Sequence, residues 1–576
     1  MKKTLHIQAC LLLIAFGLLN SCSDAFLDVK PNGALDASVL ATEEGIDALL
    51  IGAYAMLDGV SGNGFGWEAA SSNWVFGSIR GMEANKGTDS GDQPDINPLQ
   101  NYSEATTNPY INIKWRSFYE GISRANSVIP VVTTALEEGT ITQEQADLFL
   151  KQARAIRGHL HAEAHKMYDL IPYVDENTDL ATVTNTVDVR ELILADLTEG
   201  TTLPDNMGQI GRFNGTVCKV LKAKALMQMN GNYEEAKALL QDVANSGTKP
   251  DGSAIGLSTT FGEIFDAENR NGIESVYTVQ YSVNDGSGGW NGGWGEVLNF
   301  PYKSGESPGG CCGFFQPTQE FVNSFRTDGG LPLLDNSYND DPVLNDQGLA
   351  ADDASYVEDP GPLDPRLDWT VGRRGIPYWD WGDHTGQDWI RDQSYAGPFS
   401  PKKQVYKQAQ EGALTEVGNW TSGYTANGYR MIRYADVLLL LAECQAETGD
   451  LGGALENVNA IRTRAANPDG FVTEEDGVTP AANYVINTYD SFADKDMALK
   501  AIQMERKLEL GMEGHRFFDL KRWGNAQAEI NRILSYEKPL RSALYNSGTT
   551  FGTEDIAFPI PQRQIDLSSG NLSQNR

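Results

Sequence analysis

Residues 434–454 read YADVLLLLAECQAETGDLGGA, and residues 217–236 read VCKVLKAKALMQMNGNYEEA. In both stretches an apolar helical pattern ends at a glycine, Gly449 or Gly231. Glycine can adopt the left-handed conformation that closes a helix, and the Asp or Asn that follows can cap the next one. A large apolar residue comes next, and an alanine three positions later allows the two helices to approach closely. Each stretch therefore predicts a helical hairpin of the tetratricopeptide type.

Helical periodicity extends outward from these hairpins to residues 43–56, 112–132, 142–168 and 498–522. Thr142 with Gln145 three residues later predicts a capping box at the start of one helix. Between residues 249 and 427 the periodicity fades, and Gly, Pro, Asp and aromatic residues dominate. Only Glu274 to Val283 alternates as a short strand would. The fold class predicted is mostly α, with a few short strands.

The predicted organisation is one domain over residues 22–576. Its helical scaffold covers about 36–245 and 428–576, and an irregular region covers about 249–427. An irregular stretch of this length in a compact domain is usually functional. The chain has 576 residues and 40% hydrophobic residues, enough for a sizeable core.

The formal net charge of -33 makes nucleic acid and anionic lipid poor partners. The few cysteines do not form the dense disulfide framework of a small secreted protein.

The N-terminus carries the features of a bacterial lipoprotein signal. Lys2 and Lys3 precede an apolar segment over residues 9–19, and Leu19-Asn20-Ser21-Cys22 resembles a lipobox. The segment is too short for a stable membrane span. We expect residues 1–21 to be a signal peptide and Cys22 to be the lipidation site, where several acyl chains give stable anchoring. The alternative is an ordinary secretory signal with an incidental cysteine.

Ordered motifs along nearly the whole chain resemble the SusD/RagB family of outer-membrane nutrient-uptake lipoproteins. They lie at residues 26–31 (FLDVKP), 115–119 (WRSFY), 124–126 (RAN), 154–158 (RAIRG), 168–172 (YDLIP), 313–318 (GFFQPT), 364–366 (DPR), 430–437 (RMIRYADV), 505–510 (ERKLEL), 514–520 (GHRFFDL) and 558–561 (FPIP). None is decisive alone, and the specificity comes from their order behind a lipobox.

The resemblance implies a helical fold with tetratricopeptide units on one side and a ligand site on the opposite, loop-rich side. It also implies a partner, a TonB-dependent porin of the SusC type, on which the lipoprotein sits at the outer membrane, facing the extracellular side. The ligand is expected to be an oligosaccharide or polysaccharide, and the protein is expected not to be an enzyme.

Tryptophans in glycine-rich loops are the candidate ligand-binding residues, because indole rings stack on the C–H faces of sugars while polar side chains bind the hydroxyls. In family members the site draws on the loop after the first helix and on the central irregular region. The candidates are Trp67, Asn73, Trp74, Trp290, Asn291, Trp294, Trp379 and Trp381. Any of these tryptophans could instead fill a gap in the core.

The charged motif residues are interpreted as structural rather than catalytic, with Arg430, Arg433 and Asp436 pairing with the segment 505–519. His161 and His165 have a spacing that suits zinc, but the zincin pattern is absent, so packed histidines are expected and no metal site is assigned. No cofactor is expected. A structural calcium at Asp89 and Asp92 is an alternative, although the spacing is not that of an EF-hand.

Two further alternatives concern cysteines and cargo. Cys311 and Cys312 are adjacent, and either a vicinal disulfide or two buried thiols would fit.

The cargo could be a peptide, as in RagB-like members of the family, or the protein could be a surface glycosidase, although no acid/base motif is recognisable. A purely protein-binding scaffold is disfavoured by the long irregular region.

Overall fold

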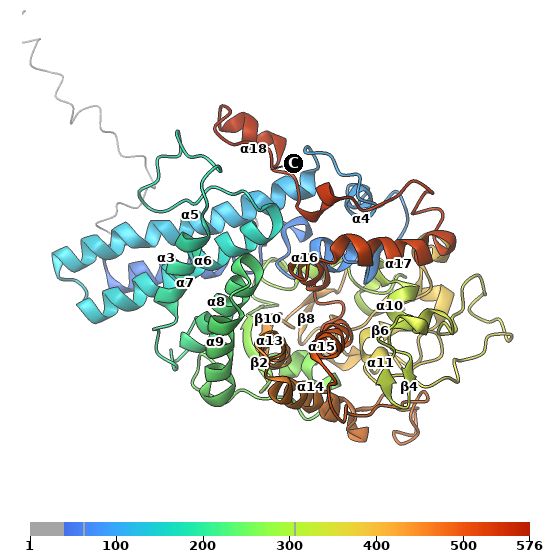
Figure 1. The fold of residues 1–576 in the computed structure, drawn as a ribbon. Helices are drawn as coiled ribbons and strands as arrows, with labels where there is room; N and C mark the ends of the chain where they lie inside the picture. The colour runs from blue at the N-terminus through green and yellow to red at the C-terminus, as the bar shows by residue number, and fades with distance from the viewer. Residues whose placement is uncertain (1–39, 62–63, 304–306, 576) are drawn as a thin grey trace, which may run out of the picture.

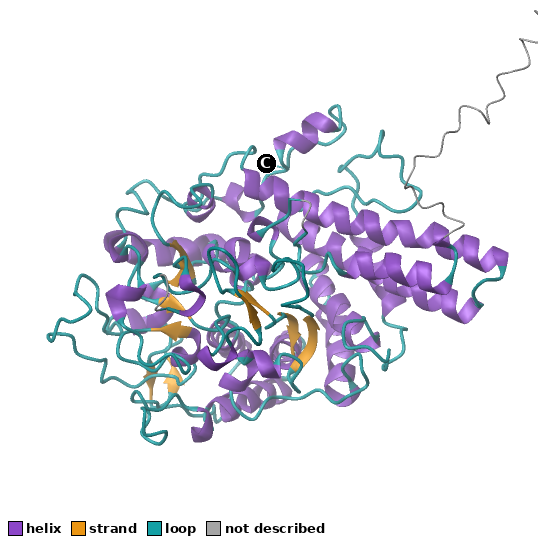
Figure 2. Cartoon of the chain, turned by 180° about the vertical axis from the view of Figure 1, so that it is seen from behind, coloured by secondary structure: helices purple, strands orange, loops and turns teal. Residues whose placement is uncertain are grey.

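The computed structural model describes residues 40–61, 64–303 and 307–575. The longest helices lie together on one side of the molecule, and most of the loops lie on the other side, among shorter helices and short strands (Figures 1 and 2). The larger helices are α3 (Glu43–Tyr54), α5 (Pro109–Glu138), α6 (Gln143–Tyr168), α7 (Arg190–Gly200), α8 (Gly215–Asn230), α9 (Tyr233–Ser246), α13 (Tyr434–Glu447), α14 (Leu451–Ala465), α15 (Lys495–Glu509), α16 (Arg516–Arg522) and α17 (Ala526–Leu540). The shorter ones are α4 (Ile96–Gln100), α10 (Gln319–Asn323), α11 (Leu367–Thr370), α12 (Gln393–Ala396) and α18 (Gln562–Leu567).

The strands form five separate antiparallel pairs, and none of the pairs extends into a larger sheet within the described ranges. They are β1 (Ala84–Gly87) with β3 (Phe314–Pro317), β2 (Ser275–Val279) with β10 (Tyr429–Arg433), β4 (Thr327–Asp328) with β5 (Leu331–Pro332), β6 (Val371–Gly372) with β7 (Ser400–Pro401), and β8 (Thr415–Glu416) with β9 (Tyr424–Thr425). In the longest pair Tyr429 faces Val279 and Arg433 faces Ser275, with irregular register between them. The mostly α prediction with few short strands is confirmed.

The hairpin signals act as expected from the sequence. Gly231 ends α8 at φ 60°, and Asn232 caps α9 by accepting a hydrogen bond from the amide of Glu235. Between α13 and α14, Gly449 has a φ of 91°, and Asp450 caps α14 by accepting a hydrogen bond from the amide of Gly453. Helix α13 packs on both α14 and α9, so the two hairpins join into one layer. The capping box of Thr142 and Gln145 is present at the start of α6.

The helix predicted over residues 498–522 is wrong in one respect, because it is two helices, α15 and α16. Met512 and Gly514 between them adopt positive φ angles of 67° and 80°. A Cβ at Gly514 would lie 1.9 Å from the carbonyl oxygen of Ser72, so the chain must break its helix to approach that backbone. The break therefore follows from a contact between segments far apart in sequence.

A buried network of ion pairs joins the scaffold to the irregular region. Arg366 contacts Asp364, Glu505 and Glu509, and all four side chains have no exposed surface. Arg433 forms a further ion pair with Glu509. Buried, fully paired charges of this kind hold segments in one arrangement.

The pairing predicted for Arg433 and Asp436 is confirmed, because Arg433 pairs with Glu509 and Asp436 with Arg506. The pairing predicted for Arg430 is wrong. Its guanidinium instead donates to the side-chain oxygen of Asn427 and to the carbonyl oxygen of Asp266.

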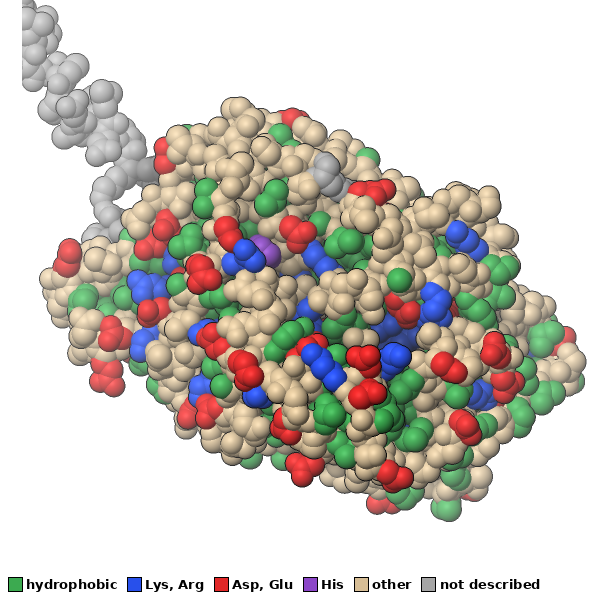
Figure 3. All heavy atoms as spheres, in the orientation of Figure 1, with side chains coloured by type: hydrophobic (Ala, Val, Ile, Leu, Met, Phe, Trp, Pro, Cys, Tyr) green, Lys and Arg blue, Asp and Glu red, His purple; other side chains and the backbone are tan. Residues whose placement is uncertain are grey.

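In the part of the chain that the structure describes, no helix is both long enough and apolar enough to cross a membrane. Acidic and basic side chains are mixed over the face seen in Figure 3. The expected signal peptide and Cys22 lie outside the described residues.

Candidate ligand-binding site

Five aromatic rings from three distant segments gather into one group, here called the aromatic cluster. The ring of Trp294 lies nearly parallel to the rings of Trp290, Tyr424 and Trp67, with centroids 4.0, 5.1 and 6.1 Å away. Trp420 meets Tyr424 edge to face at 6.0 Å. Trp290 is 37% exposed and Trp420 is 42% exposed, whereas Tyr424 is buried. The cluster thus holds two partly exposed indoles on a packed aromatic base.

Glycines make this packing possible. A Cβ at Gly289, which has φ +86°, would lie 2.7 Å from the ring of Tyr424, and a Cβ at Gly66 would lie 3.1 Å from Nε1 of Trp294. The amide of Gly293 donates to the carbonyl oxygen of Thr425 at 2.9 Å, which ties the tryptophan loop to β9. Larger residues at the two crowded glycines would push the rings apart.

Polar groups surround the exposed indole of Trp290. Asn291 is exposed, and its side-chain nitrogen donates to the carboxylate of Asp285 at 2.8 Å. Its backbone carbonyl oxygen accepts from the backbone amide of Ser282 at 2.7 Å. Trp290 and Asn291 also line a groove of about 510 Å³, here called the polar groove, which reaches α3 and α5. A flat apolar face beside hydrogen-bonding groups is the arrangement that sugar rings require.

Of the residues singled out in the sequence, Trp67, Trp290, Trp294 and Asn291 come together here. Trp420 and Tyr424 were missed. Their signal was present, because both lie in the short glycine-containing stretch 418–424 of the irregular region, but nothing in the sequence indicates that β9 brings this stretch against Trp294.

Trp74 and Asn73 lie beneath the surface, contrary to their placement in a ligand-exposed loop. Trp74 is 2% exposed, its indole N–H donates to the carbonyl oxygen of Gly295 at 3.0 Å, and its ring packs edge to face on Phe314 and Phe315. Residues Trp74–Ile79 form a π-helix, and Asn73 before it is 5% exposed with φ 52°. Trp74 therefore has no free face on which a sugar could stack, and it supports the loop that carries Trp294.

Trp379 and Trp381 belong to other groups of side chains. The ring of Trp379 meets Trp369 edge to face at 5.0 Å, and the indole N–H of Trp381 donates to the carbonyl oxygen of Tyr406 at 3.0 Å. Both are half-buried against apolar side chains. Neither makes a ring contact with the aromatic cluster within the described chain.

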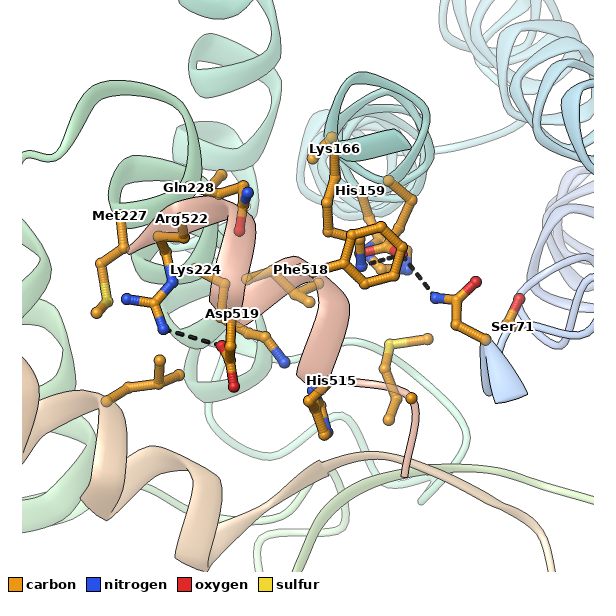
Figure 4. Close-up of a pocket in the computed structure, with 18 of the residues that line it drawn as sticks. Ser71, His159, Lys166, Lys224, Met227, Gln228, His515, Phe518, Asp519 and Arg522 are labelled. Carbon is orange, nitrogen blue, oxygen red and sulfur yellow. Dashed lines mark hydrogen bonds and ion pairs between the residues drawn. The ribbon is translucent and has the colours of Figure 1, made fainter. Parts of the chain in front are cut away.

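An inner cavity of about 90 Å³ lies between α6, α8 and α16 (Figure 4). Charged side chains line it, and most are paired: Lys166 with Glu163 at 2.5 Å, and Arg506 with Asp519 at 2.8 Å. Burial lowers the pKa of His159 to about 4, so this imidazole is neutral at pH 7. The paired charges and neutral imidazole are consistent with a packed interior.

The histidines on α6 are not arranged as metal ligands. The Nδ1 of His161 lies 3.0 Å from the carbonyl oxygen of Arg157, and its Nε2 accepts from the amide of Val174 at 3.1 Å. Both ring nitrogens are thus engaged, and burial lowers the pKa of His161 to about 3. Across residues 40–61, 64–303 and 307–575, no group of three His, Cys, Asp or Glu side chains is placed to hold a metal ion.

The alternative of a calcium at Asp89 and Asp92 does not fit the geometry. The ammonium of Lys86 donates to the carbonyl oxygens of both residues, at 2.7 and 2.5 Å. Arg391 pairs with both carboxylates at 2.8 Å. Two protein cations therefore occupy the positions that a metal ion would need.

At residues 311 and 312 the two cysteines form a vicinal disulfide, which decides between the two states that the sequence allowed.

Residues 273–576 match the model of the SusD family, which is more than half of the chain. The chain is 23% identical over 544 residues to SusD-like protein P38 from Formosa agariphila, covering 91% of this chain and 93% of that protein. A SusD-like protein from Bacteroides ovatus is 23% identical over 46% of this chain and 48% of its own length. The chain belongs to the SusD family.

Solved structures share the fold. A SusD superfamily protein from Bacteroides vulgatus superposes with a TM-score of 0.65 at 17% identity, covering 93% of this chain and 98% of that one. Surface glycan-binding protein A from Bacteroides thetaiotaomicron, solved in complex with laminarihexaose, gives a TM-score of 0.63 at 20% identity, covering 93% and 99%.

Proposed function

We propose that this protein is a non-catalytic surface lipoprotein that captures an oligosaccharide on its aromatic cluster. The observation that carries the proposal is the stack of Trp67, Trp294 and Trp290, whose outer indole is exposed beside Asn291 and the polar groove. Stacking would remove the apolar face of a sugar ring from water, and the neighbouring amides would bind its hydroxyls. Family membership and the laminarihexaose complex of a similar structure support the glycan as cargo.

The captured glycan would pass to a SusC-type TonB-dependent porin in the outer membrane. Lipid on Cys22 would hold the protein at the outer membrane, facing outward, while residues 1–21 are removed as a signal peptide. Metabolic labelling with a palmitate analogue tests the anchor: wild type should be labelled and Cys22→Ser should not. Co-purification of a porin from solubilised membranes tests the partner, and its absence would remove the delivery step while leaving glycan capture intact.

Calorimetric titration of residues 23–576 against neutral and acidic oligosaccharides and against peptides tests the cargo. Saturable heat with an oligosaccharide supports the proposal. Heat with peptides alone would replace it with a peptide-capturing, RagB-like function. Release of shortened oligosaccharides during incubation would show a glycosidase and contradict the non-catalytic role.

A further inference from the structure

The polar groove is lined by residues of α3 and α5 as well as by Trp290 and Asn291. Arg124 on α5 is one of these lining residues. The segment that precedes α8 contributes Gln209 and Arg212. The groove is therefore continuous with the aromatic cluster, and its amide and guanidinium groups lie among apolar side chains such as Ile51, Val60 and Val279.

Arg212 is held rigidly in the lining of the groove. Its Nη2 donates to Asp47 at 2.7 Å, its Nε donates to Gln209 at 3.1 Å, and its guanidinium lies 5.4 Å from the ring centre of Tyr54. The residue is 8% exposed, and its Nη1 has no hydrogen-bond partner among the described residues. A buried donor without a partner favours an acceptor supplied from outside, because a buried polar group that makes no hydrogen bond destabilises the folded state.

Arg124 supplies a second cation to the same groove. Its Nε donates to Glu120 at 2.9 Å and its Nη1 donates to the carbonyl oxygen of Gly52 at 3.1 Å, so the side chain is fixed while 29% of it remains exposed. Fixed guanidinium groups bind carboxylate and sulfate oxygens well, because several N–H donors lie in one plane.

Asp58 is the acidic side chain in the lining, and burial raises its pKa to about 7. Its carboxylate accepts from the amide of Val60 at 2.8 Å. Below about pH 7 Asp58 is mostly protonated, so the lining itself holds two guanidinium groups and no ionised carboxylate, while Asp47 and Glu120 pair with those groups from outside the lining. The chain as a whole carries -33, so a free anion is repelled at long range. If the anionic group is covalently joined to a sugar that stacks on Trp290, the stacking offsets that repulsion and holds the group near the groove.

We propose that the polar groove is a subsite for an acidic sugar, whose carboxylate or sulfate group is bound by Arg212 and Arg124. The inference rests on the proposed glycan capture and narrows it to glycans with an anionic substituent. The aromatic cluster supplies stacking energy that any sugar can use, whereas the two arginines discriminate in favour of the charged one.

The test compares calorimetric affinities for hexagalacturonate, its methyl ester, a sulfated galactan hexaose and laminarihexaose. We expect an acidic probe to bind at least about tenfold more tightly than the two neutral probes, because hydrogen bonds between a guanidinium and an anion are stronger than those between neutral groups. Comparison of hexagalacturonate with the sulfated hexaose distinguishes carboxylate from sulfate. Acidic probes that bind no better than neutral ones would overturn the inference.

Variants separate this subsite from the stacking site. Arg124→Gln with Arg212→Gln should remove the preference for the acidic probe and leave the affinity for the neutral probes unchanged. Arg190→Gln, at a half-exposed arginine outside the groove, is the matched control. If the Arg212 variant does not fold, Arg124→Gln alone and the dependence of acidic-probe affinity on sodium chloride carry the test.

The outcomes distinguish the two proposals. Loss of all binding in Trp290→Ala with no effect of the arginine variants would overturn the acidic subsite and leave glycan capture standing. Absence of binding to every oligosaccharide would overturn glycan capture and the subsite with it.

Discussion

Glu509 is the carboxylate on which three arginines converge inside the scaffold. Its Oε1 lies 3.0 Å from Nη1 of Arg433 and 2.5 Å from Nη2 of Arg464, and its Oε2 lies 3.1 Å from Nη1 of Arg366. All four side chains are at most 3% exposed, so water cannot replace a lost partner. The replacement Glu509→Gln removes the charge and keeps the size of the side chain.

The cost of this replacement follows from the partners that remain. Arg366 and Arg433 each keep two other carboxylates, but Arg464 keeps only Glu274 within the described chain. Removing one partner of a buried ion pair costs about 3–5 kcal/mol. We expect the lower end, about 3 kcal/mol, because most of the positive charge stays compensated.

Urea unfolding of residues 23–576, followed by tryptophan fluorescence and circular dichroism, measures this cost. Asp242→Asn is the control, because Asp242 pairs with Lys219 at the surface with side chains 51% and 25% exposed, and such pairs contribute at most about 1 kcal/mol. If Glu509→Gln unfolds at the same urea concentration as Asp242→Asn, the network does not stabilise the fold as reasoned.

Three further results are expected. Burial raises the pKa of Glu537 to about 7, so from about pH 4.5 to 7 the folded state keeps a proton that the unfolded state loses, and stability falls as pH rises. As pH rises from 4 to 8, the free energy of unfolding of Glu537→Gln, measured in urea, should therefore increase by up to about 3 kcal/mol relative to that of wild type. No relative increase would contradict the raised pKa. His161 has a folded pKa of about 3, so as pH falls below 6.5 the unfolded state gains a proton that the folded state does not, and stability falls. Between pH 7 and 5 the free energy of unfolding should therefore decrease by roughly 2 kcal/mol less in His161→Phe than in wild type. An equal decrease in both proteins would refute this. Because Lys86 and Arg391 occupy the loop of Asp89, calcium should leave the melting temperature unchanged, and a rise on addition would show a site that the geometry does not provide.

Local chemistry made much of the scaffold predictable. Gly231 and Gly449 with their capping neighbours mark both hairpins, because a left-handed turn and a cap are properties of a few adjacent residues. The break between α15 and α16 was not predictable, because it depends on the approach of Gly514 to the backbone of Ser72, which lies more than 400 residues earlier.

The candidate site was predictable in part for the same reason. Glycine-rich tryptophan loops indicated Trp290 and Trp294, and the stacking of Trp294 on Trp67 follows the expected pairing of two loops. The burial of Trp74 and the arrival of Tyr424 depend on tertiary packing and on the β8–β9 pair. Composition cannot tell an indole that covers the core from one that is left uncovered for a ligand.

Calorimetric titration of Trp290→Ala tests glycan capture most directly, with the best oligosaccharide found for wild type. Trp379→Ala is the matched control, because this half-buried tryptophan packs with Trp369 outside the aromatic cluster. We predict that Trp290→Ala weakens binding by about tenfold, since loss of a stacking indole costs about 1.4 kcal/mol, while Trp379→Ala retains wild-type affinity. Unchanged affinity in Trp290→Ala would contradict capture on the aromatic cluster.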